Sequence, residues 1–433
     1  MSAHRRNLSL PTPGVLSFDE AAALVAQYAD RLLRVRPPIE RVELSNALGR
    51  VLARPLRADS DQPPFARSTR DGYACRAAEV SAHEPLIVAG TTRAGQAPAG
   101  PLPRKSAWEI MTGAAIPKGA DAVAMLEHVD ATDGSIRLLP KRILESGENI
   151  VARGAQARKG AVLLAAGSAI SAAQIALAAT CGCAELEVFV KPRVAILATG
   201  DEIVPVDAVP GLGQIRNSNA PMLAAMVEAA GGAPRVLPAA RDTDEALDAA
   251  ISEAADADLL VVTGGVSAGK YDLVEPALAR AGARFHFTGV LIQPGKPTVF
   301  GERPHNSMNA NQKPRSMQSC FGLAGNPISS AVTFLLFAAP ILAALAGRKE
   351  YGPRFALARL AAEVKAKPGL TRFLPASCTF AGPLPKVQLV PWQGSGDIAA
   401  MATANCFLVV PDEPKRATKT HLKSGSIVRI LLP

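Results

Sequence analysis

The feature that most constrains the fold is a regular alternation of continuous apolar segments with helical segments, which begins at Arg193. The expected elements are, in chain order, strand 194–200, helix 219–230, strand 235–240, helix 243–255 capped by Thr243, strand 259–265 and helix 272–281. Strands that are apolar along their whole length are buried on both faces, and the intervening helices cover them. The sequence therefore predicts an α/β fold around a doubly wound, mostly parallel sheet in three α/β/α layers.

The segment that follows is expected to complete this sheet. A further strand is predicted at 285–292, followed by the hairpin-like segment PGKPTVFG and a long helix from Ile328. The polar segment 302–319 is expected to be an exposed insertion without regular structure. The apolar run 331–347 is barely long enough to span a membrane and contains Pro340, so a buried helix is the favoured interpretation.

The pattern of apolar runs and of Gly and Pro in the remaining chain predicts three further domains. Residues 15–57 have helical patterns, with Ser17 as a cap and a second short helical pattern at 42–52, whereas short runs broken by Gly and Pro follow from Pro63. The expected domains are a discontinuous N-terminal helical and extended domain at 1–57 and 151–190, an inserted β-rich domain at 58–150, the α/β domain at 191–350 and a C-terminal β-barrel-like domain at 351–433.

Composition narrows the class of ligand. The formal net charge of +9 suits anionic ligands such as phosphates and oxyanions. Aromatic residues make up only 4% of the chain, the basic residues are dispersed, and no nucleic-acid-binding signature is present, so nucleic acid is not expected as a partner. The six scattered cysteines and the absence of an apolar secretory core predict a cytoplasmic protein with free thiols and no membrane anchor.

Glycine-rich loops follow three of the predicted strands. These loops are Thr199-Gly200-Asp201-Glu202, Thr263 to Gly269, and Gly325-Asn326-Pro327. In doubly wound folds ligands bind at the carboxyl ends of the strands, where glycines let backbone N–H groups approach an anion. We therefore expect the three loops to converge on one edge of the sheet and to hold a phosphate.

The middle loop also resembles a nucleotide-binding signature. GGVSAGKY from Gly264 almost satisfies the Walker A pattern, but Tyr271 stands where Ser or Thr would bind magnesium. A P-loop ATPase or kinase therefore stays an alternative. The favoured interpretation is that Gly264, Gly265, Ser267 and Gly269 cradle a phosphate of another ligand.

Acidic residues gather at the same expected edge. Asp201 and Glu202 follow the first strand, Asp242 follows the next, and Asp272 begins a helix. Magnesium commonly takes one or two carboxylates and completes its shell with water and phosphate oxygens. The sequence thus predicts a metal–phosphate site, with Asp201, Glu202 and Asp242 as the metal ligands.

Short motifs at these loops also point to a family. TGDE from Thr199, GGVSAGKYD, PGKP from Pro294 and GLAGNPIS resemble, in order, the molybdopterin-binding domain of the molybdopterin molybdenumtransferase family, which includes the gephyrin E domain. RSTRDGYA from Arg67, MTGAAIPKGADAVAMLE, GENIVARG and QGSGDIAAMATANCFLVVP from Gln393 extend the resemblance over nearly the whole chain.

The resemblance implies a four-part subunit that forms a homodimer. Each active site would lie between the α/β domain of one subunit and the inserted β domain of the other. The implied reaction transfers molybdate to the dithiolene of adenylylated molybdopterin, with Mg²⁺ assisting and AMP released. A molybdopterin adenylyltransferase is the implied donor of that substrate.

The resemblance also implies roles for individual residues. Catalytic or magnesium-side roles would fall to Asp71, Thr112, Glu202, Asp242 and Asp272. Substrate and its phosphates would contact Thr199, Gly200, Gly264, Gly265, Ser267, Gly269, Pro294, Gly295, Gly325, Asn326 and Pro327. Molybdate would contact Lys296, Ser329, Arg372 and Ser395, because ammonium, guanidinium and hydroxyl donors complement an oxyanion.

The chain departs from the family pattern at several positions. Gln156 stands where an acid is common, Gln293 where Lys or Arg is common, and Ala324 where Pro is common, while Leu370 and Pro375 replace arginines. The lost charges leave open a non-catalytic molybdopterin-binding or scaffold protein. A molybdopterin adenylyltransferase is a further alternative, against which the additional N-terminal and C-terminal domains argue.

Overall fold

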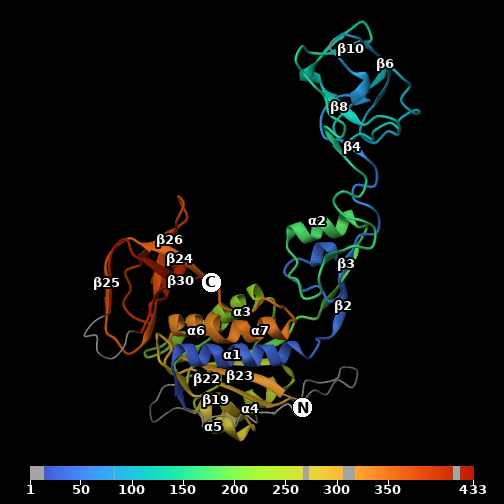
Figure 1. Cartoon of the computed structure of the whole chain (residues 1–433). Helices are drawn as coiled ribbons and strands as arrows, with labels where there is room; N and C mark the ends of the chain where they lie inside the picture. Colours follow the sequence, from blue (N-terminus) through green and yellow to red (C-terminus); the bar gives the residue numbers. More distant parts are fainter. Residues whose placement is uncertain (1–13, 82, 267–272, 306–316, 413–419) are drawn as a thin grey trace, which may run out of the picture. The chain divides into compact units, whose positions relative to one another are not determined.

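The chain folds into two compact units in this computed structural model, which describes residues 14–81, 83–266, 273–305, 317–412 and 420–433 (Figure 1). The first unit comprises Met1–Ala53, Gly167–Ile170 and Glu187–Pro433, and the second unit comprises Arg54–Ala166 and Ser171–Leu186. The four domain boundaries expected from the sequence stay a prediction.

A six-stranded sheet forms the centre of the first unit. Its strand order is β17 (Ala233–Val236), β14 (Arg193–Ala198), β18 (Leu259–Thr263), β23 (Met317–Leu323), β22 (Val299–Pro304) and β19 (Arg284–Phe287). The first four strands are parallel, whereas β22 is antiparallel to both of its neighbours. The predicted doubly wound, mostly parallel sheet is confirmed.

Helices cover both faces of this sheet. Along β14, Val194 and Ile196 pack into one core, and Ala195 and Leu197 pack into the core on the opposite face. The first core is covered by α1 (Phe18–Leu33), α3 (Asn219–Ala229) and the helical run α6 (Pro327–Thr333), η5 (Phe334–Ala338) and α7 (Ala339–Leu345). The second is covered by α4 (Asp244–Glu253), η4 (Ala254–Asp256) and α5 (Val274–Arg280). Figure 1 shows α1 and α7 on one side of the sheet and α4 and α5 on the other.

Both predicted helix caps, at Ser17 and Thr243, are present in the structure. Ser17 and Glu20 form a capping box at the start of α1, in which the backbone N–H of Ser17 donates to the Glu20 carboxylate at 2.9 Å. Thr243 caps α4 by accepting from the backbone N–H of Ala246 at 3.2 Å. Each cap satisfies N–H groups that lack a partner in the first helical turn.

The apolar helix at Pro327–Leu345 is a core element. It has 19 residues and enough hydropathy to span a membrane by length and composition, but 89% of its most apolar window is buried inside the first unit. Ile328, Phe337 and Ile341 are fully buried in the first core. The interpretation as a buried helix is confirmed.

Three local expectations are wrong. The pattern at 42–52 is not a helix, because β2 (Ile39–Glu43) and a short 3-10 turn at Leu44–Asn46 occupy its start, and Val51 accepts a bond from the backbone of Phe189. The single strand expected at 285–292 is divided among β19, β20 (Gly289–Val290) and β21 (Ile292–Gln293).

The third correction concerns the polar segment 302–319. β22 continues to Pro304 and β23 begins at Met317, and the two strands pair in register as far as Pro304 opposite Met317. Polar residues are accommodated at this buried end of the strand pair because their side chains form hydrogen bonds with each other. Arg303 and Gln318 are both buried and are joined by a hydrogen bond of 2.5 Å. Residues 306–316 of the expected insertion lie outside the described residues.

The C-terminal part of the first unit is a small closed sheet. Five strands pair in a ring: β26 (Thr371–Thr379), β27 (Lys386–Leu389), β24 (Phe355–Leu360), β30 (Ile427–Leu431) and β28 (Cys406–Val410), which pairs with β26 again. Closure removes the exposed edges that an open sheet of this size would leave. The expected β-barrel-like domain is thus confirmed, and β21 joins it alongside β26.

The second unit contains its own six-stranded sheet. Its order is β8 (Ala122–Met125), β5 (Gly72–Cys75), β7 (Ser106–Ile110), β6 (Leu86–Thr92), β10 (Ser135–Leu138) and β9 (Val129–Thr132). This unit also holds the pairs β3 (Leu56–Arg57) with β12 (Val162–Leu164) and β4 (Arg67–Ser68) with β11 (Ile150–Val151), as well as α2 (Ala172–Thr180). The β-rich structure predicted after Pro63 is confirmed by these strands.

The first core depends on a pair of stacked aromatic rings. Phe321 of β23 stacks on Phe300 of β22 with ring centroids 4.5 Å apart, and both are fully buried. We expect Phe321→Ala to lower the free energy of unfolding of the first unit by about 3–5 kcal/mol, because it removes a buried ring and leaves a cavity. Urea titration would measure the change. Phe380→Ala, at a residue that is 63% exposed, is the matched control, and equal effects of the two variants would contradict this account.

Candidate functional site

A pocket of about 570 Å³ lies at the carboxyl ends of β14, β18 and β23. The loop residues that were predicted to converge there line it together: Thr199, Gly200, Glu202, Asp242, Gly264, Gly265, Gly325, Asn326 and Pro327. Loops far apart in the sequence thus meet at one edge, as expected for a doubly wound sheet.

Close backbone contact between two strand ends shapes this pocket. Gly264 has a φ of +98°, and a Cβ atom at this residue would lie 2.3 Å from the carbonyl oxygen of Thr199. The backbone N–H of Gly264 also donates to the carbonyl of Leu323 at 3.1 Å, and that of Thr199 donates to Thr263 at 3.0 Å. Only glycine fits at residue 264, both in backbone conformation and in space.

Two of the three predicted metal-binding carboxylates face the pocket. Asp242 accepts a hydrogen bond of 2.7 Å from the hydroxyl of Thr199, and Glu202 lines the pocket beside Gly200. Asp201 instead turns to Arg241, with 3.5 Å between its carboxylate and the guanidinium Nε. Within the described residues no group of three or more Asp, Glu, His or Cys comes together, and the assignment of the three carboxylates as metal ligands stays a prediction.

Two predicted residues of the glycine-rich loop, Ser267 and Gly269, and the predicted Asp272 lie outside the described residues, which resume at Leu273. The helix expected to begin at Asp272 is present from Val274 to Arg280 as α5.

The sequence did not reveal Asn219, the first residue of α3. Its Nδ2 donates to the hydroxyl of Thr263 at 2.9 Å and to the carbonyl of Gly325 at 2.7 Å, while its Oδ1 is buried and has no partner. Asn219 lines the pocket, so this oxygen is an acceptor available to a ligand N–H group. The sequence shows Asn219 only as the first residue of a predicted helix, and its contacts with Thr263 and Gly325 depend on residues far away in the chain.

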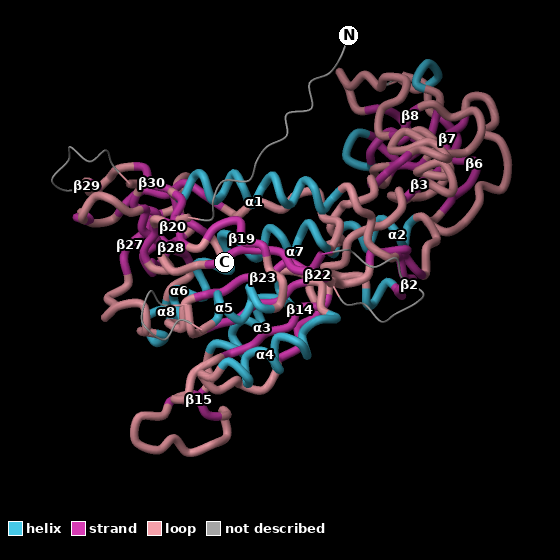
Figure 2. Tube along the Cα trace, turned by 90° about the horizontal axis from the view of Figure 1, so that it is seen from below, coloured by secondary structure: helices cyan, strands magenta, loops and turns pink. Residues whose placement is uncertain are grey.

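A ribbon formed by β15 (Ile203–Val204) and β16 (Ile215–Arg216) adds a further wall. Ile203, Ile215 and Arg216 line the pocket, and Figure 2 shows the ribbon extending away from the sheet. The apolar side chains of its connecting loop, Val209 and Leu212, are exposed.

The C-terminal barrel reaches the same pocket. Asn326 donates through Nδ2 to the hydroxyl oxygen of Ser395 at 2.9 Å, and the backbone N–H of Ile328 donates to the carbonyl of Ser395 at 3.1 Å. Gly396 and Ile398 are also in the lining. The structure therefore brings the predicted Ser395 to the start of α6, next to the glycine-rich loop at 325–327.

The remaining predicted molybdate residues are dispersed around this region. Lys296 is exposed in the loop after β21, beside Pro297 of the pocket lining, whereas Ser329 is buried in α6. Arg372 stands opposite Gln293 in the pairing of β21 with β26 and donates to the carbonyl of Lys367 at 2.8 Å. Burial lowers the pKa of this guanidinium.

Pro294 and Gly295, expected to contact substrate, form the start of the loop that carries Lys296. The Gln293–Pro294 peptide bond is cis, and Gly295 has a φ of +99°. A Cβ atom at residue 295 would lie 2.4 Å from the Thr333 methyl group, so this loop packs tightly against α6. Both residues are buried, and neither is part of the pocket lining.

Asp71 and Thr112, the other predicted catalytic residues, form a pair in the second unit. The Asp71 carboxylate accepts hydrogen bonds from the backbone N–H of Thr112 at 2.6 Å and from its hydroxyl at 2.8 Å. These bonds favour the charged form and lower the pKa of Asp71, with the backbone N–H as the larger cause. Both side chains are exposed.

This pair predicts a measurable pH dependence. Thr112→Val removes the hydroxyl bond but keeps the backbone bond, so we expect the pKa of Asp71 to rise toward its ordinary value and stay below it. Because the folded-state pKa is depressed, the stabilisation by ionised Asp71 is present above the unfolded-state pKa and lost as pH falls through the folded-state pKa. Carboxyl ¹³C NMR titration measures the shift. Thr91→Val, which removes a hydroxyl bond to Glu109, is the control and should leave Asp71 unchanged.

The close contact at Gly264 predicts a second outcome. Gly264→Ala cannot keep the loop where it is, because the new methyl group would overlap the Thr199 carbonyl. We expect the variant to lose affinity for AMP, used as a phosphate-bearing probe in calorimetry, by tenfold or more. Gly352→Ala, at an exposed glycine with nothing within 4 Å of the added Cβ, serves as the control. Unaltered AMP binding in Gly264→Ala would show that this loop does not shape the site.

Three segments of the chain match known protein families. Residues 16–182 match the MoeA N-terminal region (domain I and II), residues 195–344 match a probable molybdopterin binding domain, and residues 357–432 match the MoeA C-terminal region (domain IV). The middle match covers the glycine-rich loops and therefore favours a molybdopterin-type ligand over a P-loop nucleotide site.

Individual relatives agree with these matches. Molybdopterin molybdenumtransferase of Nostoc sp. is 34% identical over 402 residues, which is 90% of this chain and 88% of the relative. The enzyme of the same name from Bacillus subtilis is 35% identical over 425 residues, which is 96% of this chain and 94% of the relative. A crystal structure of a molybdopterin biosynthesis MoeA protein from Pyrococcus horikoshii OT3 has a TM-score of 0.77 at 26% identity and covers 97% of this chain and 100% of its own. The chain therefore belongs to the MoeA family, and the resemblance inferred from its motifs is confirmed.

Proposed function

We propose that this protein is a molybdopterin molybdenumtransferase, which inserts molybdate into adenylylated molybdopterin and releases AMP. The convergence of three glycine-rich strand ends on one pocket, with Glu202 and Asp242 in its wall and Ser395 at its rim, carries this proposal. The names of the Nostoc and Bacillus relatives support the same reaction.

The chain's own groups suit an anionic, amide-rich substrate. The glycine-rich ends of β14 and β18 allow a phosphate to approach the backbone closely. The unpartnered Oδ1 of Asn219 would accept from an N–H group of the pterin, because a buried acceptor without a partner is costly until a ligand supplies one. Nδ2 of the same side chain is held by Thr263 and Gly325, so the acceptor is oriented before the ligand arrives.

The residues at the pocket fit a magnesium ion. Glu202 and Asp242 would hold it, since two carboxylates beside a phosphate loop are a donor set that magnesium commonly uses. The bound ion would supply charge neutralisation at the pyrophosphate of the substrate. Thr199 donates to Oδ1 of Asp242 and thereby fixes the orientation of this carboxylate.

Molybdate would be held by Lys296 and Ser395. Asn326 donates to the Ser395 oxygen, so the hydroxyl proton of Ser395 is free to point to an oxyanion. Lys296 would add a positive charge from the exposed loop after β21. Ser329 and Arg372 are further candidates for molybdate contact. Ser329 is buried in α6, and Arg372 donates to the Lys367 carbonyl.

The second unit would complete the site from another copy of the chain. Asp71 is kept ionised by Thr112, and both side chains are exposed and able to meet a partner surface. We include a homodimer with an active site between subunits in the proposal, as the family resemblance implies.

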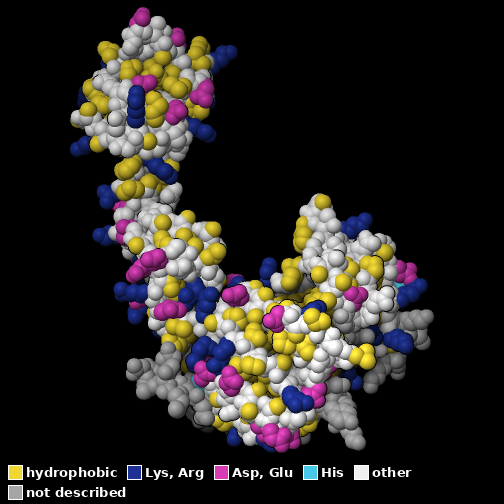
Figure 3. All heavy atoms as spheres, turned by 180° about the vertical axis from the view of Figure 1, so that it is seen from behind, with side chains coloured by type: hydrophobic (Ala, Val, Ile, Leu, Met, Phe, Trp, Pro, Cys, Tyr) yellow, Lys and Arg dark blue, Asp and Glu magenta, His cyan; other side chains and the backbone are white. Residues whose placement is uncertain are grey.

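We propose that the protein is located in the cytoplasm. We also propose that a molybdopterin adenylyltransferase supplies its substrate. All six cysteines are free thiols, which suits a reducing compartment. On the face drawn in Figure 3, basic and acidic side chains are interspersed.

One observation favours a second candidate, a molybdopterin-binding protein without transferase activity. The register partner of Arg372 is the uncharged Gln293, at a position where Lys or Arg is common in the family, so the strand that leads to Lys296 carries one cationic side chain fewer. The activity test below separates the two candidates.

The test supplies purified protein with adenylylated molybdopterin, magnesium and molybdate and measures AMP by chromatography. We expect molybdate-dependent AMP release that falls at least about 100-fold in Asp242→Asn, since removal of one group that stabilises transition-state charge commonly costs this much. Asp244→Asn is the matched control, because this exposed aspartate of α4 pairs with Arg280 of α5 and the variant should retain activity. Binding of the substrate without turnover at any molybdate concentration would favour the binding protein instead.

A further inference from the structure

A second pocket, of about 320 Å³, lies on the α4 and α5 side of the sheet in the first unit. It is bounded by α4, η4, α5 and the end of β22, and its lining includes Ile251, Ala255, Arg280 and Arg303. Arg303 pairs with Gln318 near the start of β23, whereas the proposed active site lies beyond Leu323 at the other end of that strand. A strand rises about 3.3 Å per residue, which places the two pockets roughly 17 Å apart along β23.

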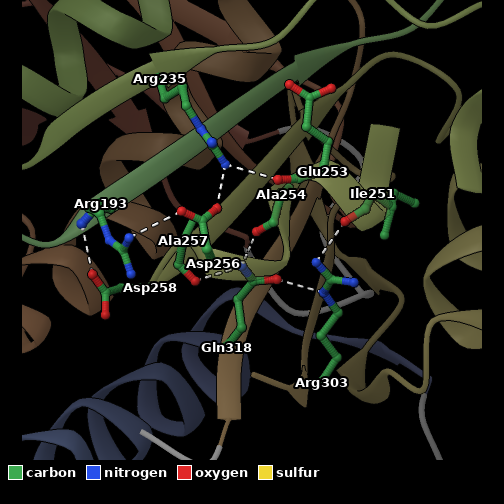
Figure 4. Close-up of polar contacts among 10 residues, drawn as sticks. All are labelled: Arg193, Arg235, Ile251, Glu253, Ala254, Asp256, Ala257, Asp258, Arg303 and Gln318. Carbon is green, nitrogen blue, oxygen red and sulfur yellow. Dashed lines mark hydrogen bonds and ion pairs between the residues drawn. The ribbon is translucent and has the colours of Figure 1, made fainter. Parts of the chain in front are cut away.

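Arg303 is an unusual residue to find in the wall of a pocket. Its exposure is only 4%, although it carries a guanidinium group that stays protonated at any physiological pH. Its Nε donates to Oε1 of Gln318 at 2.5 Å, and its Nη2 donates to the carbonyl of Ile251 at 2.8 Å. Figure 4 shows these two bonds and a third nitrogen without any contact among the residues drawn.

The surroundings hold this guanidinium rigidly. Gln318 uses both of its amide protons on the carbonyls of Ala254 and Ala257, at 2.7 and 2.6 Å, so its oxygen can only face Arg303 (Figure 4). The backbone of η4 and the side chain of Gln318 thus fix the orientation of the charge. A cation that is fixed before binding loses little side-chain entropy when an anion arrives.

The charge of Arg303 has no acidic partner among the described residues. Both of its hydrogen-bond acceptors are neutral, and burial lowers the pKa of the group. Asp248 also lines the pocket, but both of its carboxylate oxygens accept from Arg280, at 2.9 to 3.1 Å. A buried charge with only neutral partners is costly, and an anion in the adjoining pocket would offset that cost.

The remaining walls define the kind of anion. Ile251, Ala255, Ala281 and Pro304 provide apolar surface for a hydrocarbon body. Arg280 and Asp248 pair with each other in the same wall, so Arg303 leaves one uncompensated positive charge, which matches a singly charged carboxylate better than a doubly charged phosphate ester. The volume is at the lower end of the range of about 300–1,000 Å³ that small-molecule sites occupy.

We propose that this pocket is a binding site for a small monocarboxylic acid with an apolar body, whose carboxylate pairs with Arg303. The carboxylate would contact the free guanidinium nitrogen, and the hydrocarbon part would lie against α4, η4 and α5. This site is separate from the transferase pocket and does not depend on the proposed reaction.

The experiment uses the full chain, with isotope-labelled Ile and Ala methyl groups observed by NMR. Benzoate is the carboxylate probe, benzamide is its uncharged isostere, and phenyl phosphate is the dianion. We expect benzoate to shift the methyl signals of Ile251, Ala255 and Ala281, phenyl phosphate to bind more weakly, and benzamide to leave these signals unchanged. Because the signals belong to the pocket, anion binding at the transferase site does not interfere.

Two variants examine the assignment independently. Arg303→Met removes the charge and should weaken benzoate binding tenfold or more, as the loss of a bond between charged groups implies. Ser252→Phe fills the pocket from an exposed helical position, leaves Arg303 in place and should abolish binding even if Arg303→Met folds poorly. Arg137→Met, at an exposed arginine of the second unit, is the control for loss of charge.

The outcomes separate clearly. Benzoate shifts that disappear in both pocket variants and persist in Arg137→Met support the proposal. Equal shifts with benzoate and benzamide, unchanged benzoate binding in Ser252→Phe, or no shift of the three methyl signals at tens of millimolar benzoate would overturn it. Tighter binding of phenyl phosphate than of benzoate would overturn the choice of a monocarboxylate.

Discussion

The contact between Gly264 and the carbonyl of Thr199 is the constraint on which the site depends. Strands β14 and β18 are neighbours in the sheet, and their ends approach so closely that no side chain fits at residue 264. Asn219 then joins the same ends by donating to Thr263 and Gly325. A pocket lined by three separate loops results because the parallel strands all end at this edge.

The two cores of the sheet make that arrangement stable. Side chains along β14 alternate between the two faces, and every one from Val194 to Ala198 is buried. The helices on each face are thereby fixed against the strands, and α6 is placed so that Asn326 can meet Ser395 of the C-terminal barrel. Barrel and sheet thus form the pocket jointly, although the barrel has a core of its own.

Buried polar groups mark both ends of the sheet. At the carboxyl ends, Asn219 keeps an acceptor without a partner, and at the opposite edge Arg303 keeps a charge whose bonded partners are all neutral. Buried polar groups are ordinarily paired, since an unpaired one costs free energy. In both places the group adjoins a pocket, and this is the observation behind the two proposals of ligand binding.

The sequence by itself determined the α/β class, the caps at Ser17 and Thr243, and the strand-end loops, because apolar periodicity, capping and glycine-rich turns are local properties. Only the tertiary structure decided that Asp201 turns to Arg241, that Asn219 faces the pocket, and that β22 and β23 extend into the polar segment 302–319. Each of these depends on a partner distant in the chain. The sequence predicts that Arg303 and Gln318 are exposed to solvent, whereas in the structure they are hydrogen-bonded to each other. The polarity of a residue does not show whether its side chain contacts water or another residue.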